Sequence, residues 1–321
     1  MKAMVIGGAG FIGSHLCEAL LAAGDEVHCL DDFSLGTREN VTELQGNSFF
    51  YLHKVDASDY DALMVAFQQI KPEQVFHLAA NSDIQASAMN PCVEYRNTYT
   101  TTYQVLSCMR TTGVKKLFFA STSAVYGDKR DELLTENTPG LAPVSYYGAA
   151  KLGSEALISA FSFMNDFSAL VFRFPNVIGP HLTHGVIFDF IHRLWNNPGE
   201  LRILGDGMQT KPYIYVKDLV EAIVQFRDVP QGVSLYNLGV ESATSVTQIA
   251  EIIVEEMGLE NVKFSYTGGE GGWKGDVPRF QYDLTKIHQA GWHAKYTSDE
   301  AVRRTVREYL AGRRKDEANE P

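Results

Sequence analysis

The feature that most constrains the fold is a glycine-rich segment near the N-terminus. A short apolar run, 4–6, leads directly into Gly7-Gly8-Ala9-Gly10-Phe11-Ile12-Gly13, and Ser14 then opens an amphipathic stretch. Glycines at this spacing allow a tight turn, a close approach of backbone to a pyrophosphate, and close packing of a helix on a strand. The helix N-terminus adds unpaired N–H groups and a partial positive charge. An ordinary strand-to-helix turn is the simpler interpretation of such a pattern when it stands alone.

A second signal stands at the end of the next predicted strand. Asp31 and Asp32 follow Gly13 by 18 and 19 residues. A carboxylate at this place can accept hydrogen bonds from an adenosine ribose, and it disfavours a 2′-phosphate. The glycines and the acidic pair together predict NAD rather than NADP as a cofactor. Arg38 is the one nearby residue that favours the opposite choice.

Hydrophobic patterning predicts the fold class. Short β-branched runs alternate with amphipathic stretches, which predicts a Rossmann-type, doubly wound parallel sheet of the α/β class with helices on both faces. The expected strands are 4–6, 26–30, 49–55, 74–78, 116–121 and 170–173, and the expected helices are 14–23, 60–70, 94–112 and 147–163.

The second half of the chain is less regular and predicts a smaller C-terminal α/β lobe. Helical patterns at 186–196, 216–226, 246–257 and 298–310 are separated by loops rich in proline and glycine. We therefore expect a dinucleotide-binding domain over 1–177 and a substrate lobe over 178–311. Part of 206–240 is expected to return to the first domain. The charged, apolar-poor segment 312–321 predicts a disordered tail.

Composition excludes several classes of protein. The chain has 321 residues, 45% of them hydrophobic, and a net charge of −11, which disfavours nucleic acid and anionic membrane surfaces as partners. Its four cysteines show no metal-binding or disulfide spacing, so we expect free thiols in a reduced compartment and no metal site. The sequence contains no apolar stretch of about 18 residues. These observations predict a cytoplasmic protein.

Tyr147 and Lys151 are the candidate catalytic pair. They stand four residues apart at the start of a predicted helix, which places both side chains on one face. A tyrosine that acts as a base near neutral pH needs its pKa lowered by roughly 3 units, and a neighbouring ammonium and an oxidised nicotinamide would supply positive charge. The alternative is a surface pair on an amphipathic helix. Tyr146 competes for the role but has Ala150 four residues on.

Further motifs are ordered along nearly the whole chain. They are Asp31-Asp32-Phe33-Ser34-x-Gly36, Val55-Asp56-Ala57, His77-Leu78-Ala79-Ala80, Asn97, Ser121-Thr122-Ser123-Ala124-Val125-Tyr126-Gly127, Arg173-Phe174-Pro175-Asn176, Tyr213-Ile214-Tyr215-Val216-x-Asp218 and Gly272-Trp273-x-Gly275-Asp276. With the glycine loop and the Tyr147/Lys151 pair, this series resembles the extended short-chain dehydrogenases/reductases of the nucleotide-sugar epimerase and dehydratase group.

The resemblance implies a role for each matched residue. Tyr147 would take a proton from a sugar hydroxyl, Lys151 would hold the nicotinamide ribose, and Thr122, or Ser123 in its place, would share the hydroxyl hydrogen bond. The residues implied in NAD binding are Gly7, Gly10, Phe11, Ile12, Gly13, Asp31, Asp32, Phe33, Ser34, Gly36, Asp56, Ala57, Leu78, Ala79, Ala80, Asn97, Tyr147, Lys151 and Pro175. Those implied in binding a nucleotide-diphosphate sugar are Thr122, Tyr147, Asn176, Val186, Lys211 and Asp276.

One substitution narrows the reaction. Dehydratases of this group carry a glutamate where this chain has Ala124, and alanine can neither remove the C5 proton nor expel the C6 hydroxyl. The leading hypothesis is therefore 4-epimerisation of a nucleotide-diphosphate sugar. A 4-dehydrogenase that releases the ketone remains the alternative, and a dinucleotide-sensing scaffold is the non-enzymatic one.

The chain also departs from the group's pattern. Thr100 replaces the glycine of the motif that begins at Asn97, while Lys211 and Gly271 stand where arginines are usual. Lysine is a point charge where arginine is a bidentate fork, so the grip on a diphosphate would differ. The resemblance also implies a homodimer through helices 94–112 and 147–163.

Overall fold

The structure is a computed structural model that describes residues 1–81, 84–269, 271–272 and 275–319. Trp273 of the C-terminal motif and residues 320–321 of the expected tail lie outside the described residues. The chain divides into two compact units. The first comprises Met1–Gly127, Gly140–Phe174 and Val220–Tyr236, and the second Asp128–Pro139, Pro175–Leu219 and Asn237–Pro321.

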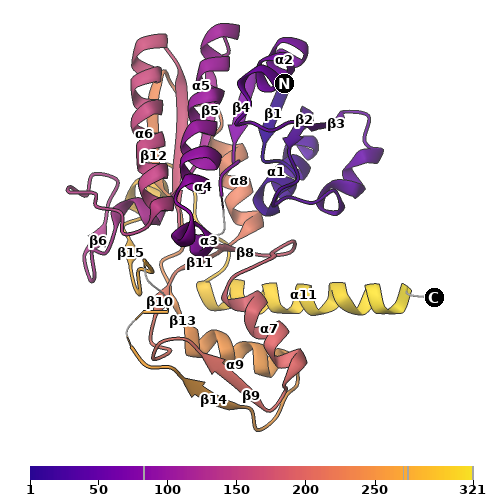
Figure 1. Ribbon diagram of the computed structural model, residues 1–321, viewed down its shortest axis with the longest axis vertical. Coiled ribbons are helices and arrows are strands. Elements are labelled where there is room, and N and C mark those ends of the chain that lie inside the picture. The colour runs from indigo at the N-terminus through magenta and orange to yellow at the C-terminus, as the bar shows by residue number, and fades with distance from the viewer. Residues whose placement is uncertain (82–83, 270, 273–274, 320–321) are drawn as a thin grey trace. The chain divides into compact units, whose positions relative to one another are not determined.

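A seven-stranded sheet forms the centre of the first unit (Figure 1). Its strand order is β12-β7-β5-β4-β1-β2-β3, and the pairings among the six strands from β7 to β3 are parallel. The strands are β1 (Lys2–Ile6), β2 (Glu26–Asp31), β3 (Phe50–Lys54), β4 (Gln74–His77), β5 (Lys116–Thr122), β7 (Ser168–Phe174) and β12 (Gly232–Asn237). The order reverses between β1 and β4, which is the arrangement of a doubly wound sheet. The predicted fold class is confirmed.

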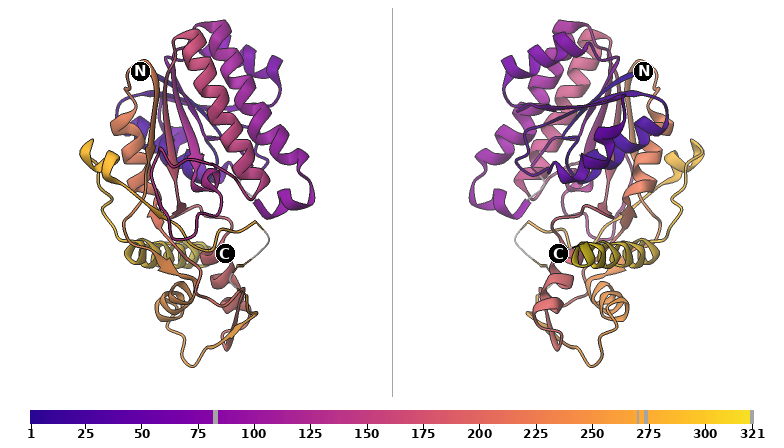
Figure 2. Two further views of the ribbon diagram at one scale, coloured as in Figure 1. Left: turned by 90° about the vertical axis from the view of Figure 1, so that its left-hand side faces the viewer. Right: turned by 90° about the vertical axis from the view of Figure 1, so that its right-hand side faces the viewer.

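Helices cover both faces of this sheet (Figure 2). Helices α2 (Tyr60–Ile70), α5 (Thr101–Thr112) and α6 (Tyr146–Asn165) lie side by side on one face, and α1 (Phe11–Ala22) lies on the other. Phe67, Leu106, Phe119 and Ile158 belong to the core between the sheet and the first three helices. The unit also contains η1 (Glu39–Gly46), α3 (Ile84–Met89), α4 (Cys92–Glu94), the π-helical turn η2 (Tyr95–Thr100), η3 (Ser123–Tyr126) and part of α8 (Val216–Phe226).

The single predicted helix 94–112 is therefore broken into α4, η2 and α5. A π-helical turn is wider than an α-helical one and interrupts the regular i→i−4 bonds. Thr101 and Thr102 add to this irregularity, because their hydroxyls donate to the carbonyl oxygens of Arg96 at 3.1 Å and Thr98 at 2.8 Å. Hydrophobic periodicity does not reveal such a turn.

The second unit is built from short strands and helices. The helices are α7 (Val186–Asn196), α9 (Val246–Glu256), α10 (Thr285–Gln289) and α11 (Ser298–Asn319), and the strands are β6 (Leu133–Leu134), β8 (Asn176–Ile178), β9 (Glu200–Ile203), β10 (Thr210–Lys211), β11 (Tyr213–Tyr215), β13 (Thr244–Ser245), β14 (Lys263–Tyr266) and β15 (Gln281–Tyr282). They pair two by two as β6–β15, β8–β11, β9–β14 and β10–β13. Ile191, Leu201, Ile249 and Val302 belong to its core.

Helix α11 differs from the expectation for the C-terminus. It extends over Ser298–Asn319 and so includes most of the segment 312–321 that the sequence predicted to be disordered. The alanine, arginine, lysine and glutamate residues in this segment are strong helix formers, which favour continuation of the helix without an apolar face. In the described part of the chain, none of the helices has the length and apolar character needed to cross a bilayer.

The crossing of β1 and α1 depends on two glycines. Gly7 has a φ of +82°, which favours glycine, and a Cβ on it would lie 2.7 Å from the backbone nitrogen of Ala79. A Cβ on Gly13 would lie 2.1 Å from the carbonyl oxygen of Gly7 and 2.7 Å from the Cα of Gly8. The helix can begin this close to the strand only because both side chains are absent.

We predict that Gly13→Ala destabilises the protein, because the added methyl group meets backbone atoms that cannot move independently. With a loss of about 2–3 kcal/mol, the midpoint of thermal unfolding should fall by roughly 5 °C or more. Gly46→Ala is the control, since no atom lies within 4 Å of a Cβ at that position. Differential scanning calorimetry measures both variants. Equal midpoints for Gly13→Ala and the native protein would contradict the interpretation.

Candidate active site

The glycine loop presents bare backbone at the start of α1. Gly10 is the N-cap residue, and its carbonyl oxygen accepts a hydrogen bond from the Ser14 nitrogen at 3.0 Å. No acidic side chain stands in the first helical turn. Backbone N–H groups with the positive end of the helix dipole attract anions. The loop therefore fits a pyrophosphate, which is the group that the sequence predicted for it.

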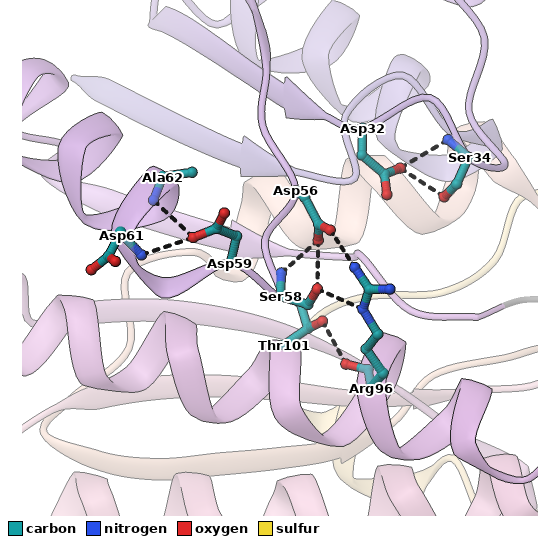
Figure 3. A network of polar contacts seen from close by, with 9 residues as sticks. All are labelled: Asp32, Ser34, Asp56, Ser58, Asp59, Asp61, Ala62, Arg96 and Thr101. Carbon is teal, nitrogen blue, oxygen red and sulfur yellow. Dashed lines mark hydrogen bonds and ion pairs between the residues drawn. The ribbon is translucent and has the colours of Figure 1, made fainter.

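Asp31 joins this loop to the turn that follows β2. Its side chain is buried, Oδ2 accepts from the Ala9 nitrogen at 2.9 Å, and Oδ1 accepts from the Phe33 nitrogen at 2.9 Å. Burial raises the pKa of Asp31, and the N–H donors of Phe33 and Ala9 partly oppose that rise. The adjacent Asp32 accepts from the nitrogen and the hydroxyl of Ser34 at 2.8 and 2.7 Å (Figure 3). Two carboxylates thus stand at the strand end where the sequence predicted a ribose contact.

Arg38 does not approach these carboxylates by any described hydrogen bond or ion pair. Its guanidinium carbon instead lies 4.4 Å from the centroid of the Phe33 ring, in a cation–π contact. Phe33 has a φ of 63°, so the turn after β2 is tight and turns this ring towards Arg38. The residue that favoured a 2′-phosphate is thus already engaged with an aromatic face.

Asp56 belongs to a second polar group at the end of β3 (Figure 3). Its Oδ1 accepts from the nitrogen and the hydroxyl of Ser58 at 2.8 and 2.7 Å, and its Oδ2 accepts from Arg96 Nη2 at 2.7 Å. Arg96 Nε also donates to the Ser58 hydroxyl at 3.1 Å. Although partial burial acts in the opposite direction, the bonds from Ser58 and the charge of Arg96 lower the pKa of Asp56. The sequence did not predict the part that Arg96 plays here.

The predicted cofactor residues of the first unit gather where β1 to β4 end. The nitrogens of Leu78 and Ala79 donate to the Ile6 carbonyl oxygen at 2.9 Å, so the segment after β4 lies against the glycine loop. Ala57 follows β3, and Asn97 is half-buried on η2. In open α/β sheets ligands bind at the carboxyl ends of the strands. Pro175 belongs to the second unit.

Thr122 and Tyr147 are brought together as the sequence predicted. Thr122 ends β5, and its hydroxyl oxygen accepts from the Ala124 nitrogen at 3.2 Å. The same hydroxyl forms a hydrogen bond with the Tyr147 side chain. Helix α6 starts close to η3, because a Cβ on Gly148 would lie only 2.5 Å from the Ala124 carbonyl oxygen. Ser123 lies in η3 and is half-buried.

Lys151 is a buried cation. Its side chain is 2% exposed, and its Nζ donates to the Ala120 carbonyl oxygen at 2.7 Å. The Nζ lies 4.6 Å from the ring centroid of Phe119 and 5.9 Å from that of Tyr147. Burial lowers the pKa of Lys151 to about 7, although the nearby carboxylates of Glu94 and Glu155 act in the opposite direction. The predicted pair is therefore adjacent, with Lys151 buried and Tyr147 half-buried.

The acidity of Tyr147 differs from the expectation. Burial raises the pKa of its phenol, the charge of Glu94 adds to the rise, and the hydrogen bond with Thr122 opposes it. We expected the ammonium of Lys151 to lower this pKa. The Lys151 ammonium donates to the Ala120 carbonyl and faces the Tyr147 ring instead of its hydroxyl. It therefore does not offset the effect of burial on the Tyr147 phenol. Further positive charge is needed to make the phenol a base.

A buried polar network that the sequence did not predict lies beside this pair. Glu94 accepts from Asn81 Nδ2 at 2.7 Å and from the Thr98 hydroxyl at 2.7 Å. The Thr102 hydroxyl contacts His77 Nε2 and the Ser154 hydroxyl, each at 3.1 Å. A signal was present, since residues 94, 98 and 102 are polar at helical spacing on the face that turns inward. Polar residues on an inner face mark a site more specifically than apolar ones.

A second buried group lies behind the end of β5. Arg173 forms a bidentate pair with Glu155, at 2.6 Å from Nη2 to Oε2 and 3.0 Å from Nε to Oε1, and Ser121 donates to the same carboxylate. Although burial acts to lower it, Glu155 raises the pKa of Arg173. The two charges are thus matched within the core.

In the second unit, three of the predicted substrate residues lie around Tyr213. Lys211 Nζ forms an ion pair with Asp276 Oδ1 at 2.5 Å. The Tyr213 side chain hydrogen-bonds Asn176, and burial together with the charge of Asp276 raises the pKa of its phenol. The fourth, Val186, is the first residue of α7 and packs against the core of this unit. The structure thus gives Lys211 an acidic partner that the sequence did not predict.

Taken by their chemistry, the residues of the first unit fit a dinucleotide. The glycine loop packs so closely that a Cβ on Gly7 or Gly13 would meet backbone, its N–H groups lie at the start of α1, and carboxylates stand at the ends of β2 and β3. No cluster of three histidine, cysteine, aspartate or glutamate side chains within the described ranges is arranged to hold a metal ion.

Known proteins share both the sequence and the fold. Residues 3–239 match the NAD dependent epimerase/dehydratase family. The chain is 30% identical to a UDP-glucose 4-epimerase from Mycolicibacterium smegmatis, over 95% of this chain and 97% of that protein. It is 28% identical to a dTDP-D-glucose 4,6-dehydratase from Mus musculus, over 96% of this chain and 88% of that protein.

Solved structures agree along nearly the whole chain. The structure superposes on a UDP-galactose 4-epimerase with a TM-score of 0.86 and 36% identity, covering 97% of this chain and 99% of the other. It superposes equally well, at 0.86, on the Thermus thermophilus UDP-glucose 4-epimerase in complex with NAD, at 29% identity and with 97% and 99% of the two chains covered. The chain therefore belongs to the NAD-dependent epimerase/dehydratase family of extended short-chain dehydrogenases/reductases and is an NAD-dependent nucleotide-sugar enzyme of that family.

Proposed function

We propose that this enzyme is a 4-epimerase of a nucleotide-diphosphate sugar. The observation that carries the proposal is the hydrogen-bonded Thr122–Tyr147 pair beside the buried Lys151, with Ala124 where a dehydratase needs an acid. Relatives named as UDP-glucose, UDP-arabinose and UDP-glucuronate 4-epimerases support the same reaction, with 30–32% identity. They favour a UDP-sugar as the substrate class.

The residues of the first unit would carry the chemistry. Bound NAD would supply the hydride acceptor for oxidation at the sugar C4 and the hydride donor for reduction on the opposite face of the 4-keto sugar. Tyr147 takes the proton of the C4 hydroxyl and gives it back, and Thr122 orients that hydroxyl. Burial raises the pKa of the Tyr147 phenol. The positive charge of an oxidised nicotinamide would lower that pKa, and strongly, because charges interact more strongly in surroundings of low dielectric constant. Glycine-loop backbone, Asp31 and Asp56 would hold the dinucleotide.

Dehydration is disfavoured by what stands at residue 124. Removal of the C5 proton and loss of the C6 hydroxyl require a general acid and base at that place. The side chain of Ala124 supplies neither. Its backbone nitrogen donates to the hydroxyl of Thr122, the N-cap residue of η3. The similarity to a mouse 4,6-dehydratase therefore reflects the shared first step, the oxidation at C4.

Two alternatives make different products. A 4-dehydrogenase would release the ketone and leave one equivalent of NADH, and a dinucleotide-sensing scaffold would make no product. We expect an epimer to accumulate without net NADH when the purified enzyme is incubated with UDP-, GDP-, dTDP- and CDP-sugars. Nuclear magnetic resonance of the sugars and absorbance at 340 nm separate the three outcomes.

Residues of the second unit are proposed to bind the nucleotide part of the substrate. Asn176, Lys211 and Asp276 surround Tyr213, and Lys211 is the cation among these residues. An incoming diphosphate would take the place of the Asp276 carboxylate on the Lys211 ammonium. We also propose the cytoplasm as the compartment, since the four cysteines carry free thiols.

Tyr147→Phe should lower kcat by about 10²–10⁴-fold, because it removes the group that exchanges the proton while leaving the ring in place. Tyr146→Phe is the matched control, since Tyr146 is 52% exposed and lies next to the proposed base. Interconversion of UDP-glucose and UDP-galactose measures both variants. Full turnover by Tyr147→Phe would refute the assignment of the base.

Lys211→Met should raise KM for the nucleotide sugar by roughly 10-fold or more, because a charge-assisted hydrogen bond to phosphate is lost, while kcat changes little. Lys217→Met is the control, since Lys217 is exposed on α8 of the same unit. Initial-rate kinetics over a range of substrate concentrations separate the two parameters. An unchanged KM would show that the diphosphate is held by other groups.

A homodimer is proposed through α5 and α6. Phe163 and Met164 are 86% and 76% exposed near the end of α6, and Tyr103 is 48% exposed on α5. Such apolar exposure on neighbouring helices is typical of an interface. Phe163→Glu should yield a monomer in analytical ultracentrifugation. Val65→Glu is the control, since Val65 is 50% exposed on α2, outside the proposed interface, and this variant should remain dimeric. A native protein that sediments as a monomer would contradict the proposal.

A further inference from the structure

Glu94 is a buried carboxylate whose contacts are all with neutral donors. Its side chain is 2% exposed, and it accepts from the Asn81 amide and the Thr98 hydroxyl, each at 2.7 Å. Within the described residues it forms no ion pair. A buried charge is costly unless an opposite charge compensates it. The carboxylate of Glu94 therefore needs a positive charge that lies nearby without forming an ion pair with it.

Glu155, the other carboxylate near the active site, differs in this respect. It forms the bidentate pair with Arg173, and Ser121 donates to it as well. Its charge is therefore already matched by a guanidinium in contact. Of the two carboxylates that act on Lys151, Glu94 alone has its charge left to balance the ammonium.

The chain that follows Glu94, the last residue of α4, packs closely against α6. A Cβ on Gly153 would lie 3.0 Å from the Tyr99 ring. Helix α6 and the turn η2 are therefore in contact at Gly153, two residues after Lys151. The hydroxyls of Thr102 and Ser154 also meet at 3.1 Å. The charge of Glu94 acts on both members of the pair, since it raises the pKa of Tyr147 and that of Lys151. These contacts place the segment that begins at Glu94 against the helix that carries Tyr147 and Lys151.

We propose that Glu94 is a positioning residue, a fixed counter-charge that keeps Lys151 an ammonium while Tyr147 gives and takes its proton. The inference rests on the proposed function, because it assigns to Glu94 a task in the reaction of Tyr147. Lys151 is sheltered from water and donates to a carbonyl oxygen, which stabilises an ammonium only in part. A carboxylate without a cationic contact of its own supplies the rest.

The other charged and titratable groups around Lys151 do not serve this purpose. His77 contacts Thr102, and burial together with the charge of Lys151 lowers the pKa of His77 to about 3, so the ring is neutral near pH 7. Arg173 faces Glu155 and the Tyr126 ring at 4.8 Å. Tyr147 is the reacting group itself.

The sign of the expected effect follows from the charge. A carboxylate favours the protonated form of both neighbours, so its removal lowers the pKa of Tyr147 and of Lys151 together. Activity that requires a deprotonated tyrosine and a protonated lysine falls on the acid and alkaline sides of the pH profile respectively. Both limbs should therefore move to lower pH, by roughly 0.5–1.5 units for a charge at this range.

The test is the pH profile of kcat/KM for the NAD-loaded enzyme with Glu94→Gln, which keeps the shape and removes the charge. Glu94→Met is a second neutral variant. Two variants restore the charge: Glu94→Asp, and the swap Glu94→Gln with Asn81→Asp, which exchanges amide and carboxylate across their 2.7 Å hydrogen bond. Ultraviolet difference titration of each protein against its Tyr147→Phe counterpart reads the phenol pKa without turnover.

We expect both limbs and the phenol pKa to move down in the neutral variants and to return in the two charged ones. A lower kcat with unmoved limbs, or the loss of folding in both neutral variants, would make Glu94 a structural anchor and overturn the inference. Failure of the proposed function looks different, because Tyr147→Phe would then keep full turnover whatever Glu94 does.

Discussion

The active site depends on one ammonium group held away from water. Among the residues that the structure describes, the Lys151 ammonium donates to the Ala120 carbonyl and lies over the face of Phe119. This arrangement requires β5 to end beside the start of α6, and that closeness requires glycine at 148, where a Cβ would meet the Ala124 carbonyl at 2.5 Å. The Thr122–Tyr147 contact has the same requirement. The position of the proposed base is therefore set by strand and helix packing rather than by a loop.

The two buried carboxylates near Lys151 differ in how their charge is balanced. The bidentate pair of Glu155 and Arg173 lies behind the end of β5, and its charges cancel locally. Glu94 is the last residue of α4, and its hydrogen bonds within the described part of the chain come from the neutral donors Asn81 and Thr98. Because a low-dielectric interior strengthens each of these interactions, small displacements of either carboxylate change the acidity of the pair.

Much of the first unit was predictable from local sequence. The glycine loop, the acidic residues that follow β2 and β3, and the Y-x-x-x-K spacing each reflect a constraint within a few residues. The polar network around Glu94 was not predicted, because it joins residues from β4, α4, η2 and α6 that hydrophobic periodicity treats separately. The pairing of Lys211 with Asp276, 65 residues apart, was missed for the same reason. At the C-terminus α11 continues to Asn319 through residues that are strong helix formers, a propensity that the charge of the segment does not reveal.

The π-helical turn η2 joins a contact at the surface to a contact in the interior. From this one turn Arg96 reaches outward to Asp56, while Thr98 reaches inward to Glu94. Two residues that stand two apart on a helical turn point to different sides, so one side chain meets Asp56 after β3 and the other meets Glu94 at the end of α4. Because both contacts start from the same turn, a displacement of its backbone would disturb the Arg96–Asp56 ion pair and the Thr98–Glu94 hydrogen bond together.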